Sequence, residues 1–225
     1  MSYPCDVRSP EQASFFDSAE LGFDPTFSGL CRIPLTAGAW VDHLPAWLAG
    51  HHAVLDILWS TTRWQSERRH MYDRIVDVPR LFATLPDGGP GHPILDDLSR
   101  ALSTRYARPL HRISLAAYRD GRDSVAFHGD RLGAQRVDAI VAIVSLGAPR
   151  RFLLRPAVGG RSRAFDLGWG DLLVMGGTCQ LTWEHAVPKV ASAGLRISVQ
   201  FRSAAEGDDG DPPAAHRVDT PDGRP

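Results

Sequence analysis

From residue 112 onward the sequence divides into short apolar segments separated by turns rich in Gly, Asp and Pro. Short strands at near-regular spacing, with turn residues between them, are typical of a β-sandwich or a barrel. We find eight such segments, the number of strands in a jelly roll. They cover residues 112–118, 124–128, 139–146, 150–156, 163–167, 171–176, 181–187 and 195–202.

The part of the chain before this region has a different pattern. Apolar residues recur at helical spacing in residues 39–59, interrupted by a proline and a glycine, and this predicts two helical pieces. Residues 94–106 form one amphipathic helical pattern, and residues 30–35 a short strand. We therefore predict a mainly β fold with flanking helices (α+β), a double-stranded β-helix (jelly roll) with an N-terminal helical buttress.

Composition divides the chain into three parts. Residues 204–225 contain few apolar side chains large enough for a core and are dominated by Pro, Gly and Asp, which is typical of a disordered tail. Residues 1–28 form an N-terminal arm whose phenylalanines pack on the domain. Residues 29–203 form a single domain with its β-helix core at about 110–203, and residues 60–92 within it are loop-like.

Charge and cysteine content limit the partners and the compartment. The formal net charge is −1 and the pI is about 6.7, so overall charge does not favour nucleic-acid binding, although a local basic face stays open. The three widely spaced cysteines argue against a disulfide framework and against a cysteine-based zinc site. No signal peptide or long apolar run is found, which predicts a soluble, cytoplasmic protein. We expect a monomer, because nothing in the sequence indicates an obligate oligomer.

One short motif at the end of a predicted strand indicates a metal. His128 and Asp130 are two residues apart, so in an extended segment their side chains point to the same face. His185 lies near the end of another predicted strand. Two histidines and one carboxylate form a facial triad, which leaves coordination positions open as Fe(II) oxygenases need. A His-x-Asp motif alone occurs often by chance, so the downstream histidine carries much of the prediction.

A pair of arginines on the last predicted strand points to an anionic co-substrate. Arg196 and Arg202 are six residues apart, which places them on one face of an extended strand. Arginine recognises carboxylates through a fixed charge and two parallel hydrogen bonds. 2-Oxoglutarate carries two carboxylates, so the pair favours that molecule. Solvated arginines at the two ends of a strand are the alternative interpretation.

Four segments together carry a family resemblance: residues 118–130, 142–156, 170–189 and 196–202. Their order and spacing resemble the AlkB-type Fe(II)/2-oxoglutarate-dependent dioxygenases, which repair alkylated nucleic acids. The resemblance implies His128, Asp130 and His185 as iron ligands, and Fe(II), 2-oxoglutarate and O₂ as requirements. It also implies that Arg196, Arg202 and Tyr118 bind the carboxylates of 2-oxoglutarate.

The chain departs from the family pattern in three places. The family often has Asn two residues before the tyrosine, where this chain has Ala116. Its nucleotide-recognition lid often has Tyr after a segment similar to residues 78–81, where this chain has Leu85. An acidic residue frequently follows the His-x-Asp motif, where this chain has Arg131 and Leu132. All three departures concern co-substrate and substrate recognition and leave the iron ligands unchanged.

The resemblance implies oxidative demethylation of N-alkylated nucleobases in DNA or RNA, releasing succinate, CO₂ and formaldehyde. The base is single-stranded or flipped out of a duplex, since a stacked base cannot reach a buried metal. Candidate substrate contacts are Trp64, Arg80, Arg131 and Trp183. A solvated basic loop and core packing of the tryptophans are the alternatives for these residues. For the whole chain, oxidation of a small molecule or a protein side chain, and a non-enzymatic binding protein, stay open.

Overall fold

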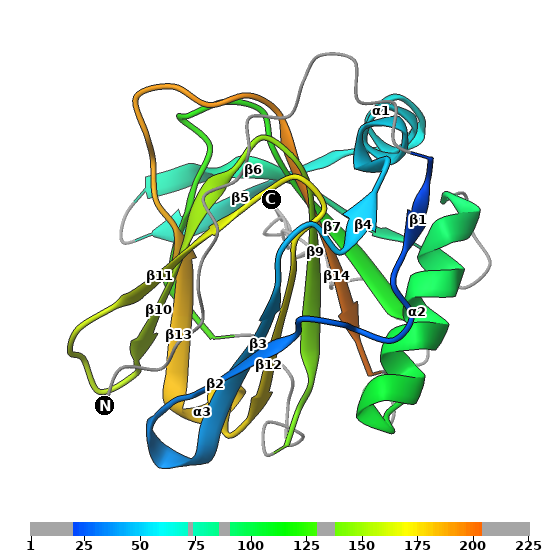
Figure 1. The fold of residues 1–225 in the computed structure, drawn as a ribbon. Coiled ribbons are helices and arrows are strands. Elements are labelled where there is room, and N and C mark those ends of the chain that lie inside the picture. The colour runs from blue at the N-terminus through cyan, green and yellow to red at the C-terminus, as the bar shows by residue number, and fades with distance from the viewer. Residues whose placement is uncertain (1–19, 72–73, 86–90, 130–137, 204–225) are drawn as a thin grey trace, which may run out of the picture.

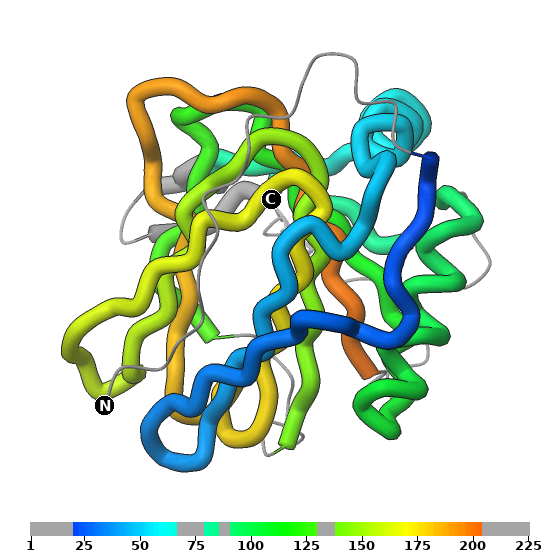
Figure 2. Tube along the Cα trace, viewed as in Figure 1, coloured from blue at the N-terminus to red at the C-terminus, as the bar shows by residue number. Residues whose placement is uncertain are grey.

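Two antiparallel sheets lie face to face in this protein, and two helices cover the outer side of the larger sheet (Figure 1). The computed structural model describes residues 20–71, 74–85, 91–129 and 138–203. The helices are α1 (His51–Thr61) and α2 (Pro93–Tyr106). Figure 2 shows the path of the chain, which forms the first strands of the large sheet before it reaches α1.

The strands of the large sheet are taken from both halves of the chain. In spatial order they are β2 (Cys31–Pro34), β3 (Ala39–Leu44), β12 (Leu172–Gly177), β9 (Val141–Gly147), β14 (Arg196–Arg202), β7 (Arg112–Tyr118), β6 (Arg74–Leu85) and β5 (Gln65–Met71).

The small sheet contains four strands, and short elements connect the two layers. Its strand order is β11 (Arg163–Leu167), β10 (Arg150–Pro156), β13 (Trp183–Val187) and β8 (Val125–His128). A separate ribbon pairs β1 (Gly22–Phe23) with β4 (Leu48–Ala49). The short helices are η1 (Thr36–Gly38) and α3 (Cys179–Thr182).

Alternation along the strands produces two cores. On β9, Ala142, Val144 and Leu146 point outward and pack in one cluster with residues of α1 and α2. Val141 and Ile143 point inward and pack with residues of the small sheet. The inner cluster fills the space between the sheets, so inward side chains from both sheets meet there. The outer cluster fixes the helices on the opposite side.

The predicted fold class is confirmed. Each of the eight predicted segments after residue 112 contains or overlaps a strand, and three of them, β7, β10 and β11, have the predicted bounds. The predicted amphipathic helix is α2, whose face with Leu95, Leu98 and Leu102 is buried in the outer core. The segment predicted at 181–187 begins with the last turn of α3 before it becomes β13.

The prediction of two helical pieces in residues 39–59 is wrong in its first half. Residues 39–44 form β3, which pairs with β2 and β12, and only α1 is helical. Ala39 and Val41 pack in the inner core, while Leu44 packs in the outer core. The segment therefore has the period of a strand with two buried faces, which a helical pattern resembles over so few residues.

The prediction that residues 60–92 are loop-like is also wrong. Residues 65–71 form β5 and residues 74–85 form β6; the two strands pair antiparallel, and β6 also pairs with β7. Backbone pairing with an established sheet gives order to this charged segment, in which the sequence shows little apolar alternation. The side chains of residues 67–78, including Arg68, Arg69 and Arg74, lie outside the described ones.

The N-terminal arm is described from residue 20 onward. Phe23 and Phe27 each lie with ring centroids 5.1 Å from that of Trp47, so this part of the arm packs on the domain as expected. The predicted tail at 204–225 and residues 1–19 lie outside the described residues. Cys31 is disulfide-bonded, which corrects the argument against disulfides at that position. No helix in the described part is long and apolar enough to cross a bilayer.

Candidate metal centre

Two histidines face each other across neighbouring strands of the small sheet. His128 ends β8, His185 lies on β13, and the two residues are direct partners in the antiparallel register. Their ring centroids are 4.3 Å apart. His185 is buried, and the ring of Phe152 stacks on it with centroids 5.3 Å apart and planes 20° apart. The pairing therefore holds two imidazoles together at the inner side of the sheet.

A backbone contact selects the nitrogen that His128 presents. Its Nδ1 lies 2.9 Å from the carbonyl oxygen of Ala126, so Nδ1–H donates to that oxygen in the neutral ring. The lone pair is then on Nε2, which is the form in which a histidine binds a metal with its other nitrogen held in place.

The donor set fits an Fe(II) ion as far as it is described. Among the described residues no group of three His, Cys, Asp or Glu side chains lies close enough to hold a metal. Asp130, the third predicted ligand, lies outside those residues. Two imidazoles from adjacent strands supply nitrogen ligands that suit iron, and a carboxylate two residues after His128 would complete a facial set.

Arg196 enters the interior from the large sheet. It is the direct register partner of Tyr118, and both side chains are buried. One terminal nitrogen of Arg196 donates to Ser145 Oγ at 2.8 Å, whereas its Nε is buried without a hydrogen-bond partner. Burial is the main cause that lowers the pKa of Arg196 to about 10. A buried guanidinium with an unused N–H fits an anionic ligand, and the solvated alternative does not apply to Arg196.

Arg202 lies at the other end of β14. Its two terminal nitrogens donate to Ser114 Oγ at 2.7 Å and to Gln200 Oε1 at 2.6 Å. Arg196, Gln200 and Arg202 lie on one face of β14, as the spacing of the two arginines predicted. Ser114 lies on the same face of the neighbouring strand β7. Ala116 lies between them on β7 and is completely buried, so this position supplies no polar group to the interior.

The predicted substrate residues are not gathered at one place. Trp183 is buried in the inner core and its Nε1 donates to the Thr36 carbonyl oxygen at 3.4 Å. Trp64 packs on the outer core and donates to the Trp59 carbonyl oxygen at 3.2 Å. Both tryptophans have the packing roles that were the alternatives. Arg131 lies outside the described residues.

The predicted lid segment belongs to β6. Leu81 and Leu85 pack against the outer core, so alternation directs Arg80 toward the inner side of the large sheet. Arg80 is half-buried there, next in sequence to the residue that pairs with Ala117. Leu85 is at the position where the family often has a lid tyrosine, and its side chain packs beneath the helices.

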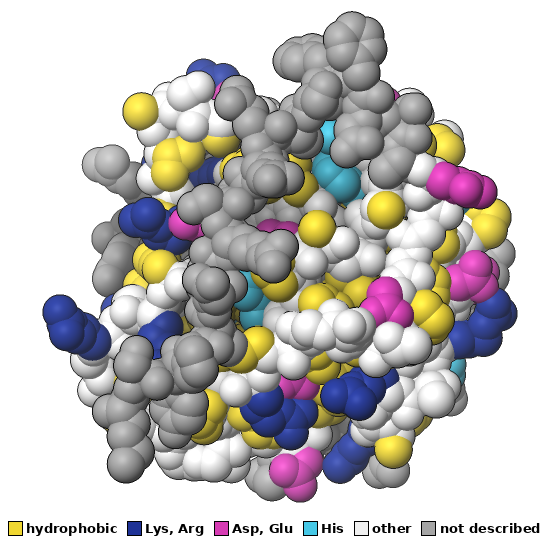
Figure 3. Space-filling view, in the orientation of Figure 1, with side chains coloured by type: hydrophobic (Ala, Val, Ile, Leu, Met, Phe, Trp, Pro, Cys, Tyr) yellow, Lys and Arg dark blue, Asp and Glu magenta, His cyan; other side chains and the backbone are white. Residues whose placement is uncertain are grey.

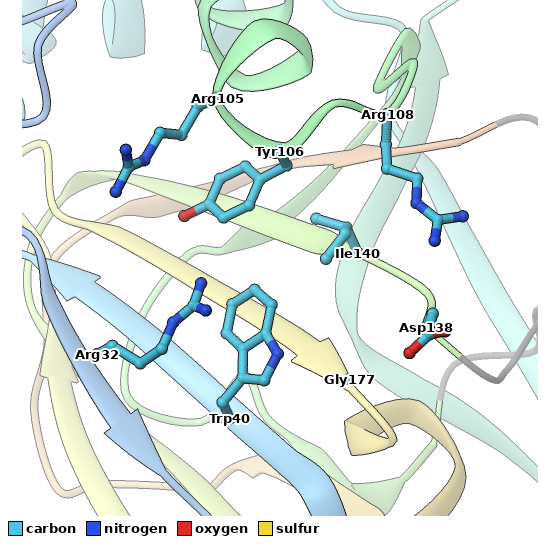
Figure 4. Close-up of a pocket in the computed structure, with 8 residues that line it drawn as sticks. All are labelled: Arg32, Trp40, Arg105, Tyr106, Arg108, Asp138, Ile140 and Gly177. Carbon is cyan, nitrogen blue, oxygen red and sulfur yellow. The ribbon is translucent and has the colours of Figure 1, made fainter.

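A separate cavity of about 310 Å³ opens on the outer side of the large sheet (Figure 4). The guanidinium of Arg32 lies 3.8 Å from the ring centroid of Trp40 and is held there by two hydrogen bonds to the buried Asp42. Tyr106 donates to the same carboxylate at 3.0 Å. The cavity lies across the sheet from the inner core, so it is distinct from the paired histidines.

Sequence reasoning missed one charged residue in the interior. Arg150 is 2% exposed and forms hydrogen bonds to three backbone carbonyl oxygens. A signal was present in the sequence, because Arg150 alternates with Phe152 and Leu154, which both face inward. An arginine at the start of a strand is nevertheless usually exposed.

Comparison with known proteins gives a consistent family. The model of the 2OG-Fe(II) oxygenase superfamily matches residues 89–202. Alpha-ketoglutarate-dependent dioxygenase alkB homolog 3 from Homo sapiens is 29% identical over 152 residues, which is 63% of this chain and 50% of that protein. The Bos taurus protein of the same name is 30% identical over 165 residues, covering 69% of this chain and 54% of that protein. The chain thus spans about half the length of these curated relatives.

Solved structures agree on the fold. OsALKBH1 matches with a TM-score of 0.55 and 16% identity, covering 77% of this chain and 100% of that one. A prolyl hydroxylase from Trichoplax adhaerens, in complex with a hypoxia inducible factor peptide fragment, matches with a TM-score of 0.56 and 13% identity, covering 76% and 85%. At these identities the likeness is one of fold.

Proposed function

The chain belongs to the 2OG-Fe(II) oxygenase superfamily, and we propose that it demethylates N-alkylated nucleobases in DNA or RNA by oxidation. Membership confirms the predicted class, a 2-oxoglutarate-dependent dioxygenase, and the predicted need for Fe(II), 2-oxoglutarate and O₂. The AlkB-like character predicted from the motifs is confirmed by the similarity to alkB homolog 3.

The similarity to alkB homolog 3 is the observation that carries the substrate proposal. It extends over 63% of this chain, well beyond the metal motif. The resemblance to AlkB-type enzymes implies an N-methyl group on a base as the carbon that is oxidised. Hydroxylation of that carbon gives a hemiaminal, which releases formaldehyde and restores the base.

In this proposal the paired imidazoles of His128 and His185, with Asp130, hold the iron. When bound, iron, 2-oxoglutarate and O₂ together would supply the oxidant for a substrate C–H bond. The chain's own part is to fix the ligands by strand pairing and to hold the co-substrate. We assign one carboxylate of 2-oxoglutarate to Arg196 and Tyr118, which are buried register partners, and the buried walls of the inner core would exclude water from the site.

Overall charge favours an accessible base over a wrapped duplex. On the one face in Figure 3, the described Lys and Arg side chains stand in separate groups. The formal net charge of −1 agrees with few phosphate contacts. We therefore propose single-stranded nucleic acid, or a base flipped from a duplex, as the form that enters.

The proposal is tested by turnover. Anaerobically purified, iron-loaded protein is mixed with 2-oxoglutarate, O₂ and a single-stranded oligonucleotide carrying 1-methyladenine or 3-methylcytosine, and succinate and formaldehyde are measured. We expect both products in equal amounts, and their loss in His128→Ala. His52→Ala is the matched control, because His52 is an exposed histidine at the start of α1.

The two products separate the alternatives. Succinate without formaldehyde or repaired base would refute the nucleobase proposal and favour a small molecule or a protein side chain as substrate. Lack of iron binding by the unaltered chain would refute the oxygenase reading of the paired histidines.

A further inference from the structure

A third arginine enters the space between the sheets from the small sheet. Arg150 is the first residue of β10, and its side chain is on the same face as Phe152, which stacks on His185. In Figure 1, β10 lies on the side opposite β7 and β14. Arg150 therefore approaches the interior from one sheet, while Arg196 approaches from the other.

The hydrogen bonds of Arg150 connect two functional strands. Its Nη1 donates to the carbonyl oxygen of Asp120 at 2.9 Å, and its Nη2 donates to those of Asp123 at 2.7 Å and Pro188 at 2.8 Å. The first two carbonyls belong to the turn that follows Tyr118. The third follows β13, the strand of His185. One buried side chain thus fastens the end of β7 to the end of β13.

Tyr118 lies close to both guanidinium groups. The Cζ atom of Arg150 is 5.5 Å from the centroid of the tyrosine ring, and that of Arg196 is 5.4 Å from it. Burial lowers the pKa of each arginine, and the charge of Arg150 adds to the lowering at Arg196. The two cations are therefore near enough to repel each other around one aromatic ring.

No carboxylate of the described residues forms a salt bridge with either arginine. Asp171, whose charge acts on Arg196, accepts hydrogen bonds from the backbone N–H groups of Ala46 and Gly168. Asp123 is occupied by the side chain of Arg119. In addition, the Nε atoms of Arg150 and Arg196 are both buried without a hydrogen-bond partner. Two buried cations that form no direct ion pair with a described carboxylate are costly, so this end of the interior favours an anionic ligand.

We propose that Arg150 is a positioning residue for the distal carboxylate of 2-oxoglutarate. It holds Tyr118 beside Arg196 and adds a second positive charge at that end of the site. This offsets the polar group missing at Ala116, and it makes the chain select 2-oxo acids that carry a second carboxylate. The inference rests on the proposed co-substrate site, and it extends that site to a strand which the paired arginines of β14 did not indicate.

The test compares two 2-oxo acids that differ only at the distal end. Dissociation constants of 2-oxoglutarate and 2-oxopentanoate are measured by calorimetry on anaerobic, Fe(II)-loaded protein. Arg150→Gln removes the charge and keeps hydrogen-bond donors, while Arg150→Lys keeps the charge. Arg151→Gln is the matched control, because the neighbouring Arg151 is 59% exposed and pairs with Asp166 on the other face of β10.

We expect the unaltered chain to prefer 2-oxoglutarate. Arg150→Gln should reduce that preference about tenfold, with little change for 2-oxopentanoate, because one buried charge is lost. Arg150→Lys should keep most of the preference, and Arg151→Gln all of it. If the role of Arg150 were purely structural, its loss would weaken the binding of both acids equally. Thermal melting followed by circular dichroism identifies variants that do not fold.

Several results would overturn the inference. A folded Arg150→Gln with an unchanged preference contradicts it directly. If Arg150→Gln does not fold, loss of the preference in a folded Arg150→Lys contradicts it, since that variant keeps the charge. Binding needs no nucleic acid, so failure to demethylate would refute the substrate proposal alone. Unchanged 2-oxoglutarate binding in Arg196→Gln would show that the co-substrate site lies elsewhere, and the inference about Arg150 would fail with it.

Discussion

The first helix contains a histidine whose burial makes the stability of the fold depend on pH. His51, the first residue of α1, is 8% exposed, and its Nδ1 accepts a hydrogen bond from the backbone N–H of Gly147 at 3.4 Å. Burial, followed by the neighbouring His52, lowers the pKa of His51 to about 4. A proton on Nδ1 would remove the acceptor and place a charge at a positive helix end.

The sign of the pH effect follows from proton counting. The unfolded chain binds a proton at His51 near pH 6.5, whereas the folded chain does so only near pH 4. Between these values the unfolded state holds more protons, so stability is full above pH 6.5 and falls as the pH is lowered toward 4. From pH 7 to pH 5, a shift of this size corresponds to a loss of about 2 kcal/mol.

The perturbation is His51→Asn, which keeps an acceptor oxygen near the position of Nδ1 and does not titrate. Urea unfolding is followed at pH 7, 6 and 5 for the unaltered chain, for His51→Asn and for the exposed control His52→Asn. The unaltered chain should lose about 2 kcal/mol more than His51→Asn over this range. The other histidines contribute equally to both and cancel. Equal pH slopes for the two proteins would refute the reasoning.

Three further predictions concern the metal, a buried carboxylate and a tight packing contact. His185→Ala should weaken Fe(II) binding about a hundredfold or more in an anaerobic chelator competition, because it removes one of two paired imidazoles; unchanged affinity would contradict the site. Asp42→Asn should cost about 2 kcal/mol in urea unfolding, since Arg32 and Tyr106 lose the charged acceptor to which both donate, whereas the exposed Asp97→Asn should cost little. Gly176→Ala should cost about 2 kcal/mol by thermal melting, because its Cβ would lie 2.1 Å from the ring of Trp40; the cost should largely vanish in a Trp40→Leu background.

The β-helix core was predictable because its strands have buried inner positions at a spacing of two. In residues 150–156, Phe152 and Leu154 alternate with outward residues, and the turn residues on either side mark the ends of the strand. The paired histidines were predictable as residues for the same reason. Their direct pairing across β8 and β13 was not, since register depends on contacts between segments 57 residues apart in sequence.

The missed features depend on long-range packing. Residues 39–44 fit helical and strand patterns equally, and the decision comes from pairing with β12, more than 120 residues later. Arg150 is buried only because three backbone carbonyls from distant segments converge on it. From the sequence, Trp64 could be interpreted as a substrate contact and Leu85 as a lid position. Nothing local in the sequence indicates that these side chains pack on the outer core with helices α1 and α2.

Because β8 lies at the outer edge of the small sheet, iron binding would affect how well this strand is ordered. Within the described residues β8 is a strand of four residues, and its pairing with β13 shifts register beside His185. A metal bound by both His128 and His185 would cross-link β8 to β13 at this edge of the sheet. By thermodynamic linkage, iron would stabilise the strand by as much free energy as an ordered strand adds to iron binding. The rate of amide hydrogen exchange along β8 would then report the fraction of the protein that holds metal.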